Sequence, residues 1–236
     1  MCGRFVSTAS PERIASYFGA EVATESLGED YNVAPTRDIY AVVTGADGVT
    51  RVQAFHWGLI PSWAKDRKIG NRMINARSET LAEKPAFRGL FKKKRCIIPM
   101  DGFYEWKPGA EDGPLNAKGR PIKQPLFISR LDGEPLAVAG LWTAWKDPTD
   151  PESRSLHSAT VITTSANKLL EPVHDRMPAL LPESHWEEWL DPGNDDVSSL
   201  GDFFAPSDDG LLTMYEVSTD VNSVRHNGPD LITPLR

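Results

Sequence analysis

Short runs of β-branched and aromatic residues, many with polar residues at alternate positions, recur along most of the chain. A period of two is typical of half-buried strands, because successive side chains point to opposite faces. The runs at 38–44 and 49–57 are joined by Gly45-Ala46-Asp47-Gly48, a composition typical of hairpin turns. Further strands, separated by turn-rich segments such as 108–121, are expected at 95–99, 102–106, 126–130, 136–142, 158–163 and 211–217. Strands therefore dominate the predicted fold.

Helical periodicity is confined to a few short stretches. Ser10, followed by a proline and an acidic residue, has the composition of a helix start, and Gly19 that of a helix stop. A first helix is predicted between them. Ser78 is expected to cap a second helix, which is interrupted near Pro85 and resumes over 87–91 before a basic run.

Two more short helices are expected at 165–170 and 183–190, the second with an apolar side formed by two tryptophans and Leu190. With so few helices to cover them, many short strands must bury their edges against one another. The pattern thus predicts an α+β fold, mainly antiparallel, with a curved or barrel-like sheet and a few short peripheral helices. A length of 236 residues is sufficient for a substantial core, and we expect one domain over 1–236.

Charge is distributed unevenly along the chain. The net charge of −7 alone argues against a nucleic-acid partner, since phosphate contacts require Lys and Arg. Between residues 63 and 95, however, eleven Lys or Arg stand against three acidic residues, a local balance of +8. Between 177 and 224 there are eleven acidic residues and no Lys or Arg. This asymmetry predicts one acidic face and one basic face, which is either simply solvated or suited to nucleic acid.

The sequence lacks targeting and cofactor motifs. No apolar run approaches the ~20 residues that cross a bilayer, and no basic segment followed by an apolar one opens the chain, so we expect a cytoplasmic protein without a membrane span. The histidines do not have the spacing of a metal site, and no phosphate-binding glycine motif is present. We therefore expect neither a metal nor a nucleotide cofactor.

The two cysteines differ in sequence context. Cys96 opens the apolar run 96–99 and is predicted to be a core residue, and two thiols suit a reducing compartment, although counting alone does not exclude a Cys2–Cys96 disulfide. Removal of Met1 would make Cys2 the N-terminal residue. An N-terminal cysteine carries an α-amine and a thiol on adjacent carbons, with reference pKa values of about 7.7–8.0 and about 8.5. By position alone, Cys2 is equally an ordinary residue of a frayed terminus.

Two strand segments carry polar residues that are suited to chemistry. In Ile74-Asn75-Ala76-Arg77, the extended period places Asn75 and Arg77 on one face, where an amide could orient a substrate and a guanidinium could hold a phosphate. A half-exposed structural strand shows the same pattern. In the segment 102–106, Glu105 stands between aromatic residues, where partial desolvation would suit it to proton transfer; a Glu on the wet side of a strand is the alternative.

A loop and an aromatic segment provide further candidates. The segment 173–178 places His174 close to Arg176 ahead of an expected strand, in the kind of loop where functional groups tend to lie. Trp63 stands at the border of the basic segment, and an exposed ring there could stack on unpaired bases. Each residue also has an ordinary structural interpretation, His174 as a buried loop histidine and Trp63 as part of the core.

Taken in order, the motifs resemble one known family. They are MCGRF at the start, YNVAP at 31–35, WGLIPSWAKD at 57–66, INARSET at 74–80, RCIIPMDGFYEW at 95–106, VITTSAN at 161–167, VHDRMP at 173–178 and VST…VN at 217–222. This set is similar to the SRAP family, the SOS-response-associated peptidase-like proteins. The resemblance extends from residue 1 to about residue 230, nearly the whole chain.

The resemblance implies a sensor of abasic sites in single-stranded DNA that attaches covalently to the lesion through its N-terminal cysteine, with no cofactor, as a monomer. It assigns a catalytic role to four residues, namely Cys2 as nucleophile, Asn75 as its positioning residue, Glu105 as acid/base and His174 as an aid to sugar and proton transfers. The residues at its DNA-contacting or pocket-shaping positions are Arg4, Asn32, Pro35, Trp63, Arg77 and Arg176. Two positions depart from the family pattern, Met100 before DGFYEW and Asp220, which could weaken a peripheral phosphate contact.

Two other functions remain open at the level of the sequence. The first is a thiol peptidase with Cys2 as nucleophile and His174 as base, whose action could be limited to removal of its own Met1; no protease signature surrounds Cys2. The second is a module that binds single-stranded DNA without bond formation.

Overall fold

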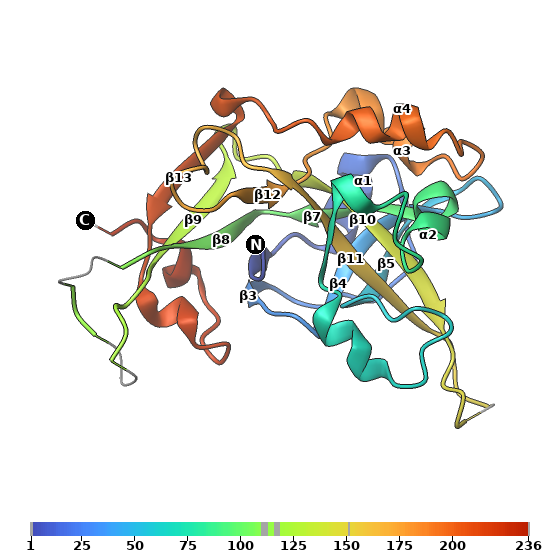
Figure 1. Cartoon of the computed structure of the whole chain (residues 1–236), viewed down its shortest axis with the longest axis horizontal. Helices are drawn as coiled ribbons and strands as arrows, with labels where there is room; N and C mark the ends of the chain where they lie inside the picture. The colour runs from blue at the N-terminus through green and yellow to red at the C-terminus, as the bar shows by residue number, and fades with distance from the viewer. Residues whose placement is uncertain (1, 110–112, 116–118, 151, 236) are drawn as a thin grey trace.

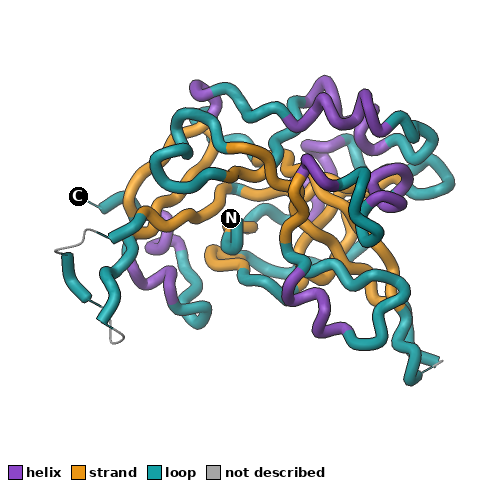
Figure 2. The backbone as a smooth tube through the Cα atoms, in the orientation of Figure 1, coloured by secondary structure: helices purple, strands orange, loops and turns teal. Residues whose placement is uncertain are grey.

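The computed structural model describes residues 2–109, 113–115, 119–150 and 152–235. Two sheets dominate it, and short helices lie around them (Figures 1 and 2). The smaller sheet has the order β13–β9–β8–β1–β3. Its strands are β1 (Phe5–Ser7), β3 (Asp30–Val33), β8 (Gly102–Lys107), β9 (Gln124–Arg130) and β13 (Leu212–Glu216).

The larger sheet has the order β12–β11–β10–β7–β4–β5–β2, and β6 pairs with β11. Its strands are β2 (Glu21–Val22), β4 (Asp38–Thr44), β5 (Thr50–Trp57), β6 (Asn75–Arg77), β7 (Arg95–Met100), β10 (Leu136–Trp145), β11 (Leu156–Ser165) and β12 (Arg176–Pro178). The strand β11 also pairs in parallel with β5, with Ser158 opposite His56. The five strands β11, β10, β7, β4 and β5 therefore close into a barrel, which confirms the expected α+β fold with a barrel-like, mainly antiparallel sheet.

The helical elements are short and peripheral. The α-helices are α1 (Pro11–Phe18), α2 (Arg88–Lys93), α3 (Trp186–Leu190) and α4 (Val197–Gly201). The 3-10 turns are η1 (Arg67–Arg72), η2 (Ser78–Thr80), η3 (Glu183–His185), η4 (Asp202–Phe204), η5 (Asp209–Leu211), η6 (Thr219–Asn222) and η7 (Pro229–Ile232). None of the helices in the described ranges is long and apolar enough to cross a membrane.

The first helix forms as its end signals predict. The Ser10 hydroxyl accepts the N–H of Arg13, and Gly19 ends the helix in the left-handed conformation at φ 62°. The predicted helix at 183–190 is also present, as the turn η3 followed by α3, with Trp189 and Leu190 buried. Both segments carry enough local information to specify their own conformation.

One helix prediction is confirmed only in its second half, and another is wrong. Ser78 does not cap a helix but begins the single turn η2, whereas the predicted continuation over 87–91 is present as α2. Residues 165–170 do not form a helix either, because β11 extends to Ser165, which pairs with Arg176 of β12. The chain must therefore return within 166–175, and it does so in a turn in which the Asn167 side chain accepts the N–H of Leu170.

The elements carrying candidate residues are attached to the barrel by specific close contacts. Gly58 and Gly70 cross so tightly that a Cβ on Gly58 would lie 2.6 Å from the Gly70 carbonyl oxygen. This crossing fixes both ends of the loop that carries Trp63.

The helices α2 and α3 are attached to the barrel through Arg95 of β7. The buried Arg95 guanidinium donates to the backbone carbonyls of Phe91 and Trp189, at the C-terminal ends of α2 and α3.

Candidate functional site

Cys2 lies where the two sheets meet. It lies three residues before β1 of the smaller sheet, is completely buried, and packs in the same apolar cluster as Phe5 and Trp57. Its backbone carbonyl accepts a hydrogen bond from Nδ2 of Asn75 on β6, at 2.8 Å. Because β6 belongs to the barrel sheet, this bond ties the start of the chain to the second sheet. Met1, whose removal was predicted, lies outside the described residues.

The Cys2 thiol is held in its neutral form. Burial raises its pKa well above the usual range, and the negative charge of Glu105 raises it further. A backbone hydrogen bond from Arg4 acts in the opposite direction but does not outweigh burial. Cys2 is therefore not a preformed thiolate, and any nucleophilic use of the sulfur requires a partner that removes its proton as the bond forms.

Glu105 lies on β8, next to the strand that follows Cys2. The register of β1 and β8 sets Phe5 opposite Phe103, so the antiparallel strands bring Glu105 level with the residue after Cys2. Its side chain is buried, with 4% exposed. Its carboxylate is thus buried close enough to Cys2 for its charge to raise the pKa of the thiol.

Asn75 is held in place through the backbone that precedes it and through its own side chain. The preceding carbonyl, that of Ile74, accepts the N–H of Val161 and the indole N–H of Trp57, which hold β6 against β11. One side of the Asn75 amide donates to Cys2. The other, Oδ1, is buried and has no hydrogen-bond partner within the described part of the chain. An orphaned buried acceptor is costly, and here it lies on the side chain that holds Cys2.

His174 lies in the return loop between β11 and β12. The strands β6 and β12 both flank the C-terminal half of β11, with Arg77 opposite Thr163 and Arg176 opposite Ser165. The His174 Nδ1 accepts the backbone N–H of Arg176 at 2.9 Å and lies 2.8 Å from a carboxylate oxygen of Asp175. The first contact favours the tautomer with hydrogen on Nε2.

Arg176 is engaged within the fold. Its guanidinium binds both carboxylate oxygens of Glu79, at 2.5 and 2.9 Å, and donates to the carbonyl of Thr163. Its side chain is 11% exposed, whereas that of Glu79 is 51% exposed. Hydrogen bonds from Arg176 lower the pKa of Glu79. Arg176 therefore clamps β12, the strand that follows His174, to the turn η2 that follows Arg77.

The remaining candidates divide into buried and exposed residues. Asn32 is 1% exposed; its amide accepts a hydrogen bond from Arg4 at 2.6 Å and donates to carbonyls of the segment 221–226. Pro35 lies in a tight turn whose next residue, Thr36, has φ 73°, a left-handed conformation that is unusual for a β-branched residue. Asn32 and Pro35 therefore help to fix the backbone that underlies the neighbouring surface. Trp63, by contrast, is 64% exposed and its ring is free to stack.

Four further findings complete the picture of the site. Arg77 is exposed next to buried Ala76, as the alternation predicted. The clamp residue Glu79 was missed by sequence reasoning; the only signal was an acidic residue within a strongly basic segment. Cys2 and Cys96 are both free thiols. In the described ranges, no cluster of three or more His, Cys, Asp or Glu side chains could hold a metal ion.

The two departures from the family pattern have clear locations. Met100 is buried in the same apolar cluster as Cys2. Asp220 lies in η6, within the C-terminal segment that the Asn32 amide holds, and its side chain is 59% exposed. Met100 therefore contributes to the packing of the core. Asp220 places a negative charge in the C-terminal segment held by Asn32, which also binds Arg4.

Comparison with known proteins places this arrangement among related chains. The sequence model of a family described as "SOS response associated peptidase (SRAP)" matches residues 1–224. The abasic site processing protein YoqW of Bacillus subtilis is 41% identical over 234 residues, covering 98% of this chain and 99% of that protein. The abasic site processing protein HMCES of Xenopus tropicalis is 36% identical, covering 80% of this chain and 59% of that longer protein.

A solved structure shares the fold. The X-ray structure of a protein from Bacteroides thetaiotaomicron superposes with a TM-score of 0.85 at 27% sequence identity, and the match covers 100% of both chains. The arrangement of two sheets around residue 2 is therefore that of an experimentally observed fold.

Proposed function

The chain belongs to the SOS response associated peptidase (SRAP) family, and from that premise we propose that it processes abasic sites by forming a covalent crosslink to single-stranded DNA. Relatives that match nearly its whole length are named abasic site processing proteins. The observation that carries the proposal is the convergence of Asn75 and Glu105, from different sheets, on the second residue of the chain.

The reaction requires a free amine on Cys2. In the full chain, the nitrogen of Cys2 is part of the peptide bond to Met1 and is not nucleophilic. Removal of Met1 converts that amide into an α-amine, and the small side chain at position 2 is compatible with that removal. The buried Oδ1 of Asn75 is then available to accept an N–H of the new amine, while Nδ2 continues to hold the Cys2 carbonyl.

The first chemical step joins the amine to the sugar. An abasic deoxyribose equilibrates between a closed hemiacetal and an open aldehyde, and His174 is suited to assist the opening. The amine of Cys2 attacks the aldehyde carbon, and loss of one water molecule forms an imine. Glu105 carries the protons that addition and dehydration require, a contribution of about 10²–10⁴-fold for a positioned acid/base.

The second step closes a ring. The Cys2 sulfur adds to the imine carbon, the thiol proton passes to the nitrogen, and a five-membered thiazolidine results without any further reactant. In the chain that retains Met1 the pKa of the Cys2 thiol is raised, so we expect the sulfur to add as neutral S–H, with the buried carboxylate of Glu105 as the candidate acceptor of its proton. Amine and thiol on one residue give a high effective concentration for closure. The captured imine no longer leads to strand cleavage.

The DNA path follows from exposure and charge. The side chains of Trp63 and Arg77 are exposed, and Arg77 lies two residues after Asn75, whose amide binds Cys2. A base can stack on the Trp63 ring, and a phosphate can pair with the Arg77 guanidinium. The side chains of Arg4 and Arg176 bind Asn32 and Glu79, so these two residues contribute positive charge and shape.

A thiol peptidase is the second candidate, since the family description contains that word. The catalytic thiolate of such an enzyme needs a lowered pKa, whereas burial and Glu105 raise that of Cys2. The peptidase activity that fits this site is a single intramolecular cleavage that removes Met1. Turnover of external peptides is not expected.

Intact-mass measurement before and after incubation with an abasic single-stranded oligonucleotide tests the proposal. We expect a protein lacking Met1, then an adduct whose mass is the sum of protein and DNA less one water, and which resists SDS. A matched variant with one extra residue between Met1 and Cys2 should not crosslink. An adduct formed equally well by that variant would overturn the proposal, as would DNA retention that disappears on denaturation.

A further inference from the structure

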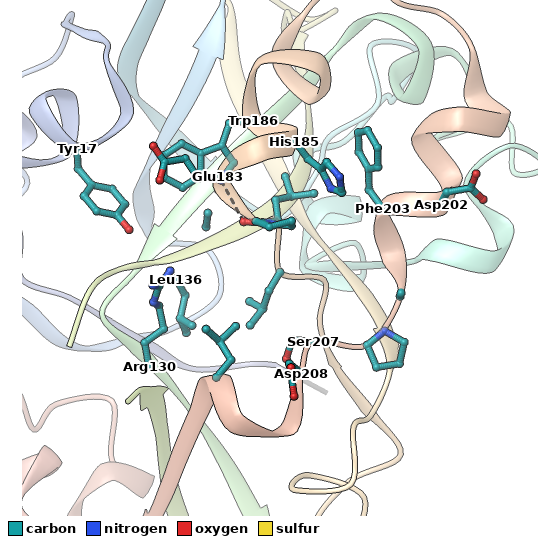
Figure 3. Close-up of a pocket in the computed structure, with 17 residues that line it drawn as sticks. Tyr17, Arg130, Leu136, Glu183, His185, Trp186, Asp202, Phe203, Ser207 and Asp208 are labelled. Carbon is teal, nitrogen blue, oxygen red and sulfur yellow. Dashed lines mark hydrogen bonds between the residues drawn. The ribbon is translucent and has the colours of Figure 1, made fainter. Parts of the chain in front are cut away.

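A large cavity lies away from Cys2, beneath the helical turns at the top of Figure 1. It has a volume of about 450 Å³ and is enclosed by α1, the ends of β9 and β10, and the segments around η3 and η4. Figure 3 shows side chains from these separate segments around one opening, among them Tyr17, Arg130, Trp186 and Phe203. A concave space of this size is in the range that binds a ligand or an anchoring side chain.

The floor of the cavity is apolar. It is formed by the buried Leu136, Leu180 and Leu181, and the indole N–H of Trp186 is already occupied by the Leu181 carbonyl at 3.0 Å. The ring of Phe203 is stacked on His185, with centroids 4.2 Å apart. An apolar or aromatic group entering the cavity would therefore meet preformed rings and leucines and displace water from them.

Two polar atoms of the lining have no partner. The His185 Nδ1 and the Ser207 hydroxyl are buried, and neither makes a hydrogen bond within the described residues. Each can accept a hydrogen bond, the imidazole through its unprotonated nitrogen and the serine through its oxygen. Buried polar atoms of this kind are normally satisfied, so both indicate an occupant that brings N–H donors.

The rim selects the charge of that occupant. The lining contains exposed Glu183, Asp202 and Asp208, whereas the one Lys or Arg among its described residues, Arg130, donates from Nε and Nη2 to the carboxylate of Asp132. The three lining acids come from separate segments, η3, η4 and the chain just before η5, and Figure 3 shows them at different points around the opening. Positive charges on both sides of an apolar anchor match this arrangement, as in a chain segment whose apolar residue is flanked by Lys or Arg.

We propose that this cavity, with its acidic rim, docks a short segment of a partner protein in which an apolar anchor residue is flanked by Lys or Arg. The anchor fills the space over Leu136, Leu181 and Phe203, and N–H groups of the segment bind His185 and Ser207. The flanking cations face Glu183 and Asp202. The DNA candidates Trp63 and Arg77 do not line the cavity, so we expect DNA and the peptide segment to bind independently.

Selection from a random peptide library displayed on phage, with the intact protein as bait, tests this proposal. Enriched sequences are expected to combine an aromatic or leucine residue with nearby Lys or Arg. One such peptide, labelled with fluorescein, then serves as the probe in anisotropy titrations. Its affinity should fall as NaCl is raised, since rim charges in an exposed setting are screened.

Two variants locate the binding site. Ala205 is exposed, lines the cavity and has an extended backbone, so Ala205→Trp fills the opening without straining the fold. The double variant Glu183→Lys with Asp202→Lys reverses the rim charge. Each should weaken peptide binding about tenfold or more, the effect expected for loss of an anchor pocket or its steering charge. Glu187→Lys, an exposed acid of α3 that does not line the cavity, is the matched control and should change binding little.

Crosslinking to abasic DNA should be unaffected in all three variants, which separates this proposal from the proposed function. Absence of enriched peptides, an acidic or uncharged consensus, or equal binding by Ala205→Trp and the unmodified protein would each overturn it.

Discussion

The two cysteines of this chain are both fully buried and both have pKa values raised by burial, yet their surroundings differ in kind. Around Cys96, burial is the only cause, and its sulfur faces Gly140, where a Cβ would lie 2.8 Å away. Around Cys2, a carboxylate and a side-chain amide from two sheets converge. Burial alone therefore does not distinguish the two cysteines; the polar groups placed around Cys2 do.

Replacing each cysteine in turn should give the largest contrast. Cys2→Ala, provided that Met1 is still removed, keeps the amine but loses the sulfur that closes the ring, so the stable adduct should disappear and strand cleavage through the imine should increase. Cys96→Ala should form the adduct at an unchanged level per folded molecule. Denaturing gels with labelled abasic DNA measure both. If Cys96→Ala lost the adduct while remaining folded, the distinction between the two sites would fail.

Neutralising the carboxylate next to Cys2 should give the second largest effect. Glu105→Gln keeps the size of the side chain but cannot relay protons, so we expect crosslinking to slow by about 100-fold, within the range for a positioned acid/base. DNA affinity, measured on an oligonucleotide without the lesion, should be retained. Glu216→Gln, at an exposed position of β13, is the control. A normal rate in Glu105→Gln would remove Glu105 from the mechanism.

Cys96 is expected to contribute to the stability of the fold and not to the reaction. Cys96→Ser places a hydroxyl in an apolar site with no partner prepared for it, which should cost about 1–3 kcal/mol of unfolding free energy. Urea denaturation followed by tryptophan fluorescence measures the change. A loss of crosslinking rate without a loss of stability would contradict the assignment of Cys96 to the core.

The smallest expected effect concerns the clamp between Glu79 and Arg176. The pKa of Glu79 is lowered in the folded protein, so its contribution to stability is present above its ordinary value of 4.5 and is lost as the pH falls through the folded value. Glu79→Gln should therefore be less stable than the unmodified protein at pH 7, by less than about 1 kcal/mol because Glu79 is half exposed, and equally stable in acid. Cys96→Ser should show no such pH dependence.

Glu79→Gln also tests whether the clamp positions His174. If it does, the crosslinking rate should fall several-fold while DNA affinity changes little, since β12, the strand that follows His174, is released from the turn after Arg77. Melting curves at pH 7 and pH 3 and single-turnover crosslinking on the same preparations decide between a purely structural clamp and a positioning one.

Local patterns in the sequence determined much of this protein. The long strands follow from alternation, and α1 follows from Ser10 and Gly19, because these signals act between near neighbours. The motif at residues 1–5 likewise marked Cys2 as a candidate nucleophile. The strands β1, β3 and β12, however, have only three or four residues each, too few to show a period, and they were not predicted.

The tertiary structure alone decided how distant residues meet. The parallel pairing of β11 with β5 and β6 closes the barrel, and it carries Asn75 to the carbonyl of Cys2 across 73 positions of sequence. The pairing of β11 with β12 overrides the predicted helix at 165–170 and lets Glu79 bind Arg176. Such contacts depend on sheet register and closure, which no local pattern encodes. The sequence therefore marked the candidate residues of the site, and the fold decided which of them face Cys2, which support the surface and which remain exposed.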